Sequence, residues 1–290
     1  MDTSTRDYLI QGSQEGQRFS LIPPRSVPQG VVGARMGMRP GSSLEFMDHR
    51  PYQVGDDLRR IDWNAYARSD KLSIKLYREE VTPHLDILLD GSRSMALANS
   101  QKAGAALAFC AAMSTAAANT HFTWMCHVAQ AQCREVLNGM QAPQHWEGLA
   151  FDYNGTPAQS IQAGPQGWRA RGSRFFVSDL LWLGEPEGVL SRLCENASTV
   201  CVVQILARAD VTVPSHGNLR LVDSETRQIL EVFVDASVRK RYQQRLDTHQ
   251  QNWHEACRHF GAVMVTLVAE DLLAHWDLQP LLEREILEIN

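Results

Sequence analysis

Asp90, Ser92 and Ser94 are the residues whose types and spacing most clearly predict chemistry, because an acid and two hydroxyls stand at alternate positions. They follow an apolar run that ends at Leu89 and precede an alanine-rich segment. Alternate residues of a short loop can direct their oxygens to one point, and a set of oxygen ligands suits a small hard cation. We therefore expect a divalent metal site here, holding Mg²⁺ or, alternatively, Mn²⁺ or Ca²⁺.

Two later positions can complete such a site. Thr156 lies in the loop Asn154-Gly155-Thr156, and Asp179 ends the apolar run that begins at Phe175. If the strands before Asp90 and Asp179 are neighbours, five side-chain oxygens meet at one edge of a sheet. The alternative is that the serines only cap a helix, which is a common use of Asp and Ser.

The expected ligand set determines what the site can do. Three neutral hydroxyls and two acids leave a divalent ion with residual positive charge and a position that another carboxylate can fill. We therefore expect binding rather than turnover, with a partner protein supplying an Asp or Glu. Arg93 and Trp182 lie beside the proposed ligands and are candidate partner contacts, although Trp182 could equally be buried against the next helix.

The elements that must position these residues follow from the hydrophobic pattern. From residue 85 apolar runs alternate with helical patterns, which predicts an α/β domain over 85–290 with a mostly parallel sheet and helices on both faces. Residues 1–84 are predicted to form a separate, irregular module with short strands. The expected elements are strands near 85–89, 122–128, 175–177, 199–206 and 262–268, helices at 96–119, from Ser237 and at 271–288, and a hairpin insertion near 217–235 with its turn at 223–226.

Composition excludes several classes of protein. The 290 residues include 28 basic and 33 acidic side chains, for a formal charge of -5, which argues against nucleic-acid binding through a basic face. We also expect no signal peptide, no membrane span, free thiols at the six cysteines, and a cytoplasmic location.

The region before Asp90 carries a long motif that resembles the signature of the family called domain of unknown function fifty-eight. The motif reads Gly41-x-x-Leu44-Glu45-Phe46-x-x-x-Arg50-Pro51-Tyr52-x-x-Gly55-Asp56-Asp57-x-Arg59-x-Ile61-Asp62-Trp63-x-x-x-Ala67-Arg68 and continues through Glu79-Glu80. Within it we expect Arg59, Asp62, Trp63 and Arg68 to form a structural, salt-bridged surface rather than a ligand site.

A second resemblance concerns the proposed ligands. Asp90-x-Ser92-x-Ser94 with Thr156 and Asp179 is similar to the metal-ion-dependent adhesion site of von Willebrand factor type A domains. Pro157, directly after the threonine, departs from the usual pattern. The resemblances imply a Rossmann-like type A fold of strand order 3-2-1-4-5-6 with the metal at its top edge. They also imply a MoxR-type AAA+ ATPase as partner, with this chain as adaptor or co-chaperone acting on a client protein.

An enzyme is the competing hypothesis. Asp90 could be the nucleophile of a Mg²⁺-dependent phosphatase or phosphotransferase of the haloacid dehalogenase type. That chemistry needs a second acid two residues on, and Ser92 cannot act as a general acid at neutral pH. We therefore expect a non-enzymatic protein.

Overall fold

Two compact units make up the chain, Met1–Pro24 with Pro83–Asn290, and Arg25–Thr82. The computed structural model describes residues 3–23, 44–79, 82–97, 100–164, 167–214, 217–223 and 228–290. Gly41 and Glu80 of the signature, and positions 224–226 of the expected hairpin turn, lie outside these residues. In the described part of the chain, no helix is both long and apolar enough to cross a membrane.

A six-stranded sheet forms the centre of the larger unit. Its strands, in spatial order, are β6 (Cys133–Glu135), β5 (Thr123–Ala129), β4 (His84–Asp90), β7 (Ser173–Ser178), β8 (Thr199–Leu206) and β11 (Val263–Val268). All pairings are parallel except that of the edge strand β6 with β5. Counted along the chain the order is 3-2-1-4-5-6, as expected, so it reverses between β4 and β7. A parallel sheet of this kind places a binding crevice at the carboxyl ends of those two strands.

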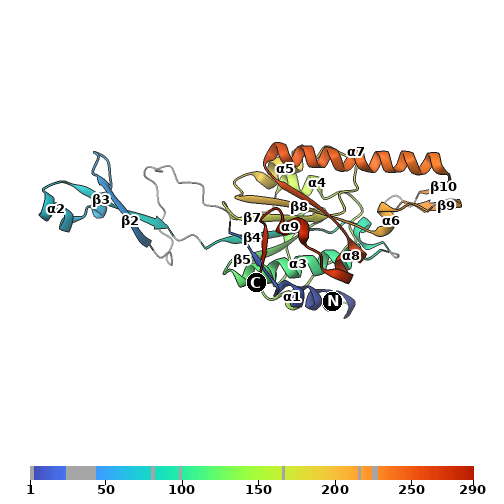
Figure 1. Cartoon of the computed structure of the whole chain (residues 1–290), viewed down its shortest axis with the longest axis horizontal. Coiled ribbons are helices and arrows are strands. Elements are labelled where there is room, and N and C mark those ends of the chain that lie inside the picture. Colours follow the sequence, from blue (N-terminus) through green and yellow to red (C-terminus); the bar gives the residue numbers. More distant parts are fainter. Residues whose placement is uncertain are drawn as a thin grey trace. The chain divides into compact units, whose positions relative to one another are not determined.

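Helices cover both faces of the sheet, as predicted (Figure 1). One face carries α3 (Lys102–Asn119), α1 (Thr3–Gly16) and α8 (Ala269–His275). The other carries α4 (Ala158–Ala163), α5 (Glu187–Cys194) and α7 (Ala236–Phe260). All seven residues of β4 are buried because the strand is covered on both sides, which explains its almost continuous apolar run.

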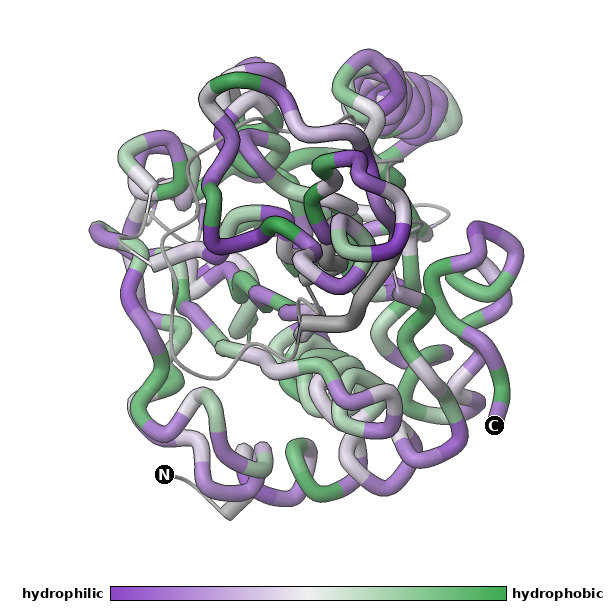
Figure 2. The backbone as a smooth tube through the Cα atoms, turned by 90° about the vertical axis from the view of Figure 1, so that its left-hand side faces the viewer, coloured by the Kyte–Doolittle hydropathy of each residue, from purple (hydrophilic) through white to green (hydrophobic). Residues whose placement is uncertain are grey.

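The helices differ in how much of their surface is buried. In Figure 2 the long α7 at the top is mainly purple, whereas the alanine-rich α3 is mainly pale green. Helix α7 buries only one stripe, Leu246, Trp253, Ala256 and Cys257. Helix α3 is buried almost all round because it lies between the sheet and α1. An alanine-rich sequence suits that position, since small side chains let two helices approach closely.

The first 24 residues do not belong to the N-terminal module in which we expected them. Helix α1 packs on α3, and β1 (Phe19–Leu21) pairs antiparallel with β12 (Leu287–Ile289). Leu9, Phe19 and Leu21 are buried in the core of the larger unit. Helix α1 is polar on average and buries glycines at positions 12 and 16, so its sequence carries little hydrophobic signal.

The end of the chain also differs from the prediction. In place of one helix over 271–288, α8 is followed by a short helix α9 (Gln279–Leu282) and by β12. Trp276 closes α8 in the left-handed conformation, with a φ of 50°. Pro280 then falls in the first turn of α9, the one part of a helix that tolerates proline.

Other elements of the larger unit follow the sequence pattern closely. The expected hairpin is β9 (Gly217–Val222) with β10 (Ile229–Val234), preceded by the short helix α6 (Arg208–Val211). The helix expected from residue 96 begins instead at Lys102, after a 3₁₀ turn, η2 (Arg93–Ala96). All six cysteines are free thiols, four of them buried, as the sequence predicted.

The smaller unit is built on an antiparallel pair, β2 (Leu44–Pro51) and β3 (Ser73–Glu79), which agrees with the strand-containing region expected there. A 3₁₀ turn, η1 (Leu58–Arg60), and helix α2 (Trp63–Ser69) lie between the strands. Asp62 caps α2 by accepting hydrogen bonds from the backbone N–H groups of Asn64 and Ala65. The same carboxylate contacts His49 Nε2 at 2.6 Å, and these hydrogen bonds hold the pKa of Asp62 below its usual range.

Candidate functional site

Asp90 is the last residue of β4 and lies at the switch point of the sheet. Gly91 turns the chain away so closely that a Cβ there would meet the Gln130 side chain at 2.6 Å and Val128 at 2.9 Å. The backbone N–H of Gly91 still donates to Ala129 O, so the loop after Asp90 is tied to β5. The local sequence thus holds the Asp90 carboxyl in place at the carboxyl end of the sheet.

The Asp90 side chain is completely buried. One carboxyl oxygen accepts from the backbone N–H of Ser92 at 2.8 Å, and the other accepts from Ser178 Oγ at 2.6 Å. Within the described part of the chain no Lys, Arg or His side chain forms an ion pair with it. Burial, and then the nearby charge of Asp179, raise the pKa of Asp90 to about 7. The site therefore contains a desolvated carboxyl group that has no cationic side chain in direct contact with it among the described residues.

Ser92 and Ser94 lie on the same side of the loop, as their alternate spacing predicted. Their hydroxyl oxygens are 3.0 Å apart, Ser92 being buried and Ser94 half-buried. Ser92 occupies the N-cap position of η2, yet its side chain makes no capping hydrogen bond. The structure therefore does not support the alternative in which Ser92 is only a helix cap.

Asp179 follows β7 and is almost fully buried at the same edge of the sheet as Asp90. One of its oxygens accepts from the backbone N–H of Leu181 at 3.0 Å. The next residue, Leu180, has a φ of 57°, and its backbone N–H bonds Ser178 Oγ while its carbonyl accepts from His249 Nε2. A left-handed leucine is costly, and these hydrogen bonds hold the turn that presents Asp179.

Lys102 is a cation that the sequence interpretation missed. Its side chain is 1% exposed, and its Nζ lies 2.8 Å from Asp179 Oδ2 and 3.2 Å from Asp210 Oδ2. Burial alone would lower the pKa of Lys102, but the two carboxylates outweigh it and raise the pKa. Asp179 is therefore already neutralised from within the protein, whereas Asp90 is not.

The structure brings the loop containing Thr156 close to the Asp90 loop. Tyr153 forms a short parallel bridge with Ser92, and its carbonyl accepts from the backbone N–H of Arg93 at 2.9 Å. Thr156 follows three residues later and is half-buried. Among the described residues its hydroxyl makes no hydrogen bond to the other four expected ligands, so its assignment stays a prediction.

The two candidate partner contacts differ. Arg93 is half-buried within η2, beside the serines. Trp182 packs inward, with its ring centroid 5.6 Å from that of Trp253 in α7 and 6.0 Å from that of Phe176. This supports the alternative of burial against a helix for Trp182. Leu183, by contrast, is 98% exposed and follows directly.

The signature residues lie in the smaller unit and have unequal surroundings. Asp62 is buried and fixes the start of α2. Arg68 Nε donates to Asn64 O, and Arg59 is exposed and donates its backbone N–H to Asp57. Trp63 is 62% exposed and meets Tyr66 edge to face at 6.3 Å. Asp62 thus has a structural role within this unit, and a surface of paired charges around the other three stays a prediction.

The donor set at Asp90 fits a hard cation in kind. It offers carboxylate and hydroxyl oxygens in a buried setting, and the uncompensated charge of Asp90 favours a bound cation. In the described part of the chain no group of three or more His, Cys, Asp or Glu side chains could by itself hold a metal ion. A metal here would therefore depend on the hydroxyls.

Some residues of this edge could not be recognised from the sequence. Ser178 precedes Asp179 and gives no motif of its own. Lys102 is a lone charge at the start of an apolar helix, which is a weak signal of burial with a partner. Asp210 lies 108 positions from Lys102 and becomes its partner only through the fold.

Comparisons with known proteins give the following similarities. The family model described as "Protein of unknown function DUF58" matches residues 48–252. The chain is 24% identical over 255 residues to the uncharacterized proteins Rv1480 of Mycobacterium tuberculosis (strain ATCC 25618 / H37Rv) and Mb1516 of Mycobacterium bovis, covering 82% of this chain and 79% of each relative. Among solved structures, BatB from Bacteroides thetaiotaomicron aligns at 10% identity with a TM-score of 0.36, over 69% of this chain and 98% of that one. An aerotolerance-related membrane protein from Bacteroides fragilis aligns at 10% identity with a TM-score of 0.34, over 70% and 96%.

Proposed function

This chain belongs to the DUF58 family of proteins of unknown function, and on that premise we propose that it is a cation-dependent protein-interaction module. Its larger unit would be a von Willebrand factor type A domain whose metal site binds a carboxylate of another protein. The observation that carries the proposal is the fully buried Asp90 carboxylate, which has no cationic partner among the described residues. A buried charge is costly unless it is paired, and a bound cation would pair it.

Asp90, Ser92 and Ser94 are the residues we assign to the ion, with Thr156 and Asp179 completing the set directly or through water. Mg²⁺ suits these oxygens, and Mn²⁺ or Ca²⁺ would use the same groups. Because Lys102 balances Asp179, the net protein charge on the ion would be low. The ion would then retain positive charge for an acidic side chain of the partner.

The resemblance noted in the sequence supports a class of partner. We propose a MoxR-type AAA+ ATPase, with this chain acting as its adaptor or co-chaperone toward a client protein. In this proposal the chain itself catalyses no reaction. Hydrolysis of p-nitrophenyl phosphate by the purified chain with Mg²⁺ would instead favour the phosphatase alternative.

Metal binding can be tested directly on the full chain. We expect one equivalent of Mn²⁺ to bind in a titration followed by electron paramagnetic resonance, and Mg²⁺ to displace it. Asp90→Asn should abolish most of that binding, because the neutral amide removes the charge that the ion would balance. Asp152→Asn is the matched control, since this exposed acid lies in the loop beside the site. Absence of Mn²⁺ binding by the wild-type chain would show that the proposal is wrong.

The partner can be tested separately. A MoxR-type ATPase should bind this chain more tightly in Mg²⁺ than in EDTA, as measured by calorimetry. Asp90→Asn should bind as weakly in Mg²⁺ as the wild-type chain does in EDTA. Equal affinity under all these conditions would leave no role for the metal in the contact.

A further inference from the structure

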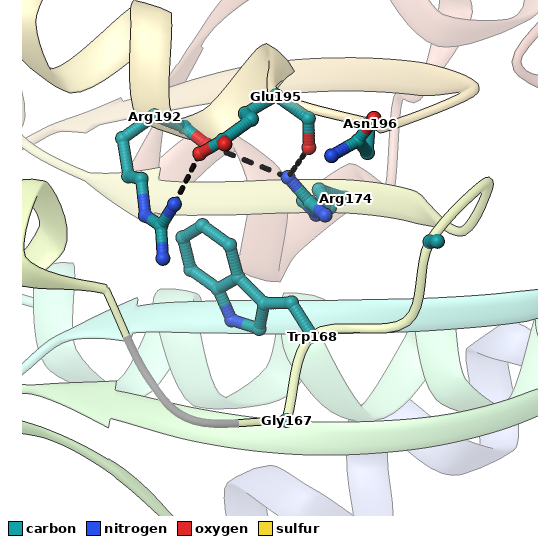
Figure 3. Close-up of a pocket in the computed structure, with 7 residues that line it drawn as sticks. Gly167, Trp168, Arg174, Arg192, Glu195 and Asn196 are labelled. Atoms are coloured by element: carbon teal, nitrogen blue, oxygen red, sulfur yellow. Dashed lines mark hydrogen bonds and ion pairs between the residues drawn. The ribbon is translucent and has the colours of Figure 1, made fainter.

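A polar pocket of about 250 Å³ lies on the opposite edge of the sheet from Asp90, where β7 begins and α5 ends. Its lining residues include Gly167, Trp168, Arg174, Arg192, Glu195 and Asn196. Figure 3 shows the indole ring of Trp168 below the side chains of Arg174 and Arg192. An aromatic ring and two guanidinium groups therefore share one small cavity.

Arg174 is fixed in this pocket. Its side chain leaves β7 and is 4% exposed, and its Nη1 donates to the carbonyls of Leu193 at 2.7 Å and Glu195 at 2.8 Å. Its guanidinium also lies 4.6 Å from the centroid of the Trp168 ring. Carbonyls at a helix end attract a cation, so these contacts hold the guanidinium in one position.

Three buried donors in the pocket lack acceptors among the described residues. They are Arg174 Nε, Arg192 Nε and Trp168 Nε1. None of these groups can accept a hydrogen bond, and an unpaired buried donor is unfavourable. No lining residue shows a buried acceptor in the same condition. What these donors lack, within the described part of the chain, is therefore an acceptor.

The charges indicate the same kind of ligand. Among the residues that line the pocket, two guanidinium groups face one carboxylate, that of Glu195, which is paired with Arg192. The buried carboxylate of Asp86 in β4 also acts on Arg174, but it is already hydrogen-bonded to His84 and His127. Burial also lowers the pKa of Arg174, which reflects a cation that its surroundings do not fully stabilise. A guanidinium fork matches the geometry of carboxylate and phosphate oxygens.

We infer that this pocket is a binding site for a small oxyanion, a carboxylate or a phosphate, held by Arg174, Arg192 and the Trp168 indole N–H. This pocket is separate from the edge of the sheet at Asp90. Anion binding in the pocket does not depend on metal binding at Asp90. The cavity is small by the standard of drug-sized ligand sites, which limits the ligand to a few heavy atoms or to one anionic group of a larger molecule.

The experiment uses the full chain labelled with ¹⁵N and follows the indole N–H signal of Trp168, assigned with Trp168→Phe. Sodium phosphate and sodium succinate are titrated separately, against sodium chloride at matched ionic strength. We expect a saturable shift of this signal with phosphate or succinate and none with chloride. The anion that binds more tightly identifies whether phosphate or carboxylate is the natural chemistry.

The variant to test is Arg192→Gln, because Arg192 lies at the partly exposed rim and its loss should leave the fold intact. Removing one charge-assisted contact should weaken binding about tenfold. Arg18→Gln is the matched control, since Arg18 also pairs with a glutamate one helical turn away, Glu15. No saturable shift at millimolar anion would mean that water serves these donors, and unchanged affinity in Arg192→Gln would place the anion elsewhere. Either result would overturn the inference.

Discussion

At the scale of single residues, the two acids at the edge of the sheet are not equivalent. Asp179 has the Lys102 ammonium at 2.8 Å, whereas the hydrogen-bond donors to Asp90 within the described residues are neutral. Two carboxylates at one buried edge repel each other, and a single lysine relieves only one of them. This inequality makes Asp90 the residue on which a cation would act.

The raised pKa of Asp90 predicts a dependence of stability on pH in EDTA. A carboxyl with a folded pKa of about 7 holds its proton more tightly in the folded chain than in the unfolded chain, where the value is near 3.8. Its contribution to stability is thus present at acid pH and is lost as the pH rises toward 7. Asp90→Asn should escape this loss. The free energy of unfolding of the variant, relative to that of the wild-type chain, should therefore rise by a few kcal/mol between about pH 4.5 and pH 7.5.

Chemical denaturation at several pH values checks this expectation. The comparison of two variants removes the effects of other titrating groups, which both share. Asp152→Asn serves again as the control and should follow the wild-type curve. If the free energy of unfolding depends on pH in the same way for Asp90→Asn and the wild-type chain, burial does not disfavour the ionised form of Asp90.

At the scale of elements, the packing of α1 on α3 depends on two glycines. A Cβ at Gly12 would lie 2.0 Å from Ala108 O, and one at Gly16 would lie 2.5 Å from Ala112 O. Both contacts are with backbone atoms of a buried helix, which cannot move aside as a flexible side chain can. The helices touch where neither carries a large side chain.

We therefore predict that Gly12→Ala destabilises the chain, although alanine is the better helix former. Overpacking of this kind should lower the free energy of unfolding by about 1–3 kcal/mol. Gln14→Ala, at an exposed position of the same helix, should change it by less than about 0.5 kcal/mol. Urea denaturation of the two variants measures the difference, and equal stability would mean that α1 can shift away from α3.

The sequence predicted elements best where a single local signal determines them. The run before Asp90 and the run before Asp179 are continuous and apolar, so both strands and their terminal acids were identified correctly. Helix α1 was missed because glycines, rather than large apolar residues, make its contact. The prediction of one terminal helix over 271–288 was wrong because Pro280 and the left-handed Trp276 interrupt a segment of otherwise helical composition. The partners of Lys102 were missed because they depend on residues far apart in the chain.

At the scale of the whole molecule, the family match leaves several structural elements outside its limits. Residues 48–252 include β4 and α3 but not α1, β1, β11 or β12. These outer elements complete the larger unit, since β11 is one of the two edge strands of the six-stranded sheet and β1 pairs with β12. The smaller unit is inserted between β1 and β4 in the sequence.

Removing residues 1–24 should therefore destabilise the larger unit. The loss of buried Leu9, Phe19 and Leu21 should lower the melting temperature by on the order of 10 °C. Replacing residues 25–82 by a long Gly/Ser linker should leave that melting temperature nearly unchanged, because these residues form their own unit. Calorimetry of both variants tests this division of the chain into two units. A larger fall in melting temperature after replacement of residues 25–82 than after removal of residues 1–24 would contradict it.

The pairing of β1 with β12 also has a consequence for synthesis. Phe19 and its partner Ile289 are 270 positions apart, so the ribosome makes Phe19 long before the strand with which it pairs. Until then the nascent chain exposes Leu9, Phe19 and Leu21 with part of their final packing missing. The larger unit therefore cannot close before Ile289 has been synthesised, and its folding depends on a contact that joins very distant parts of the sequence.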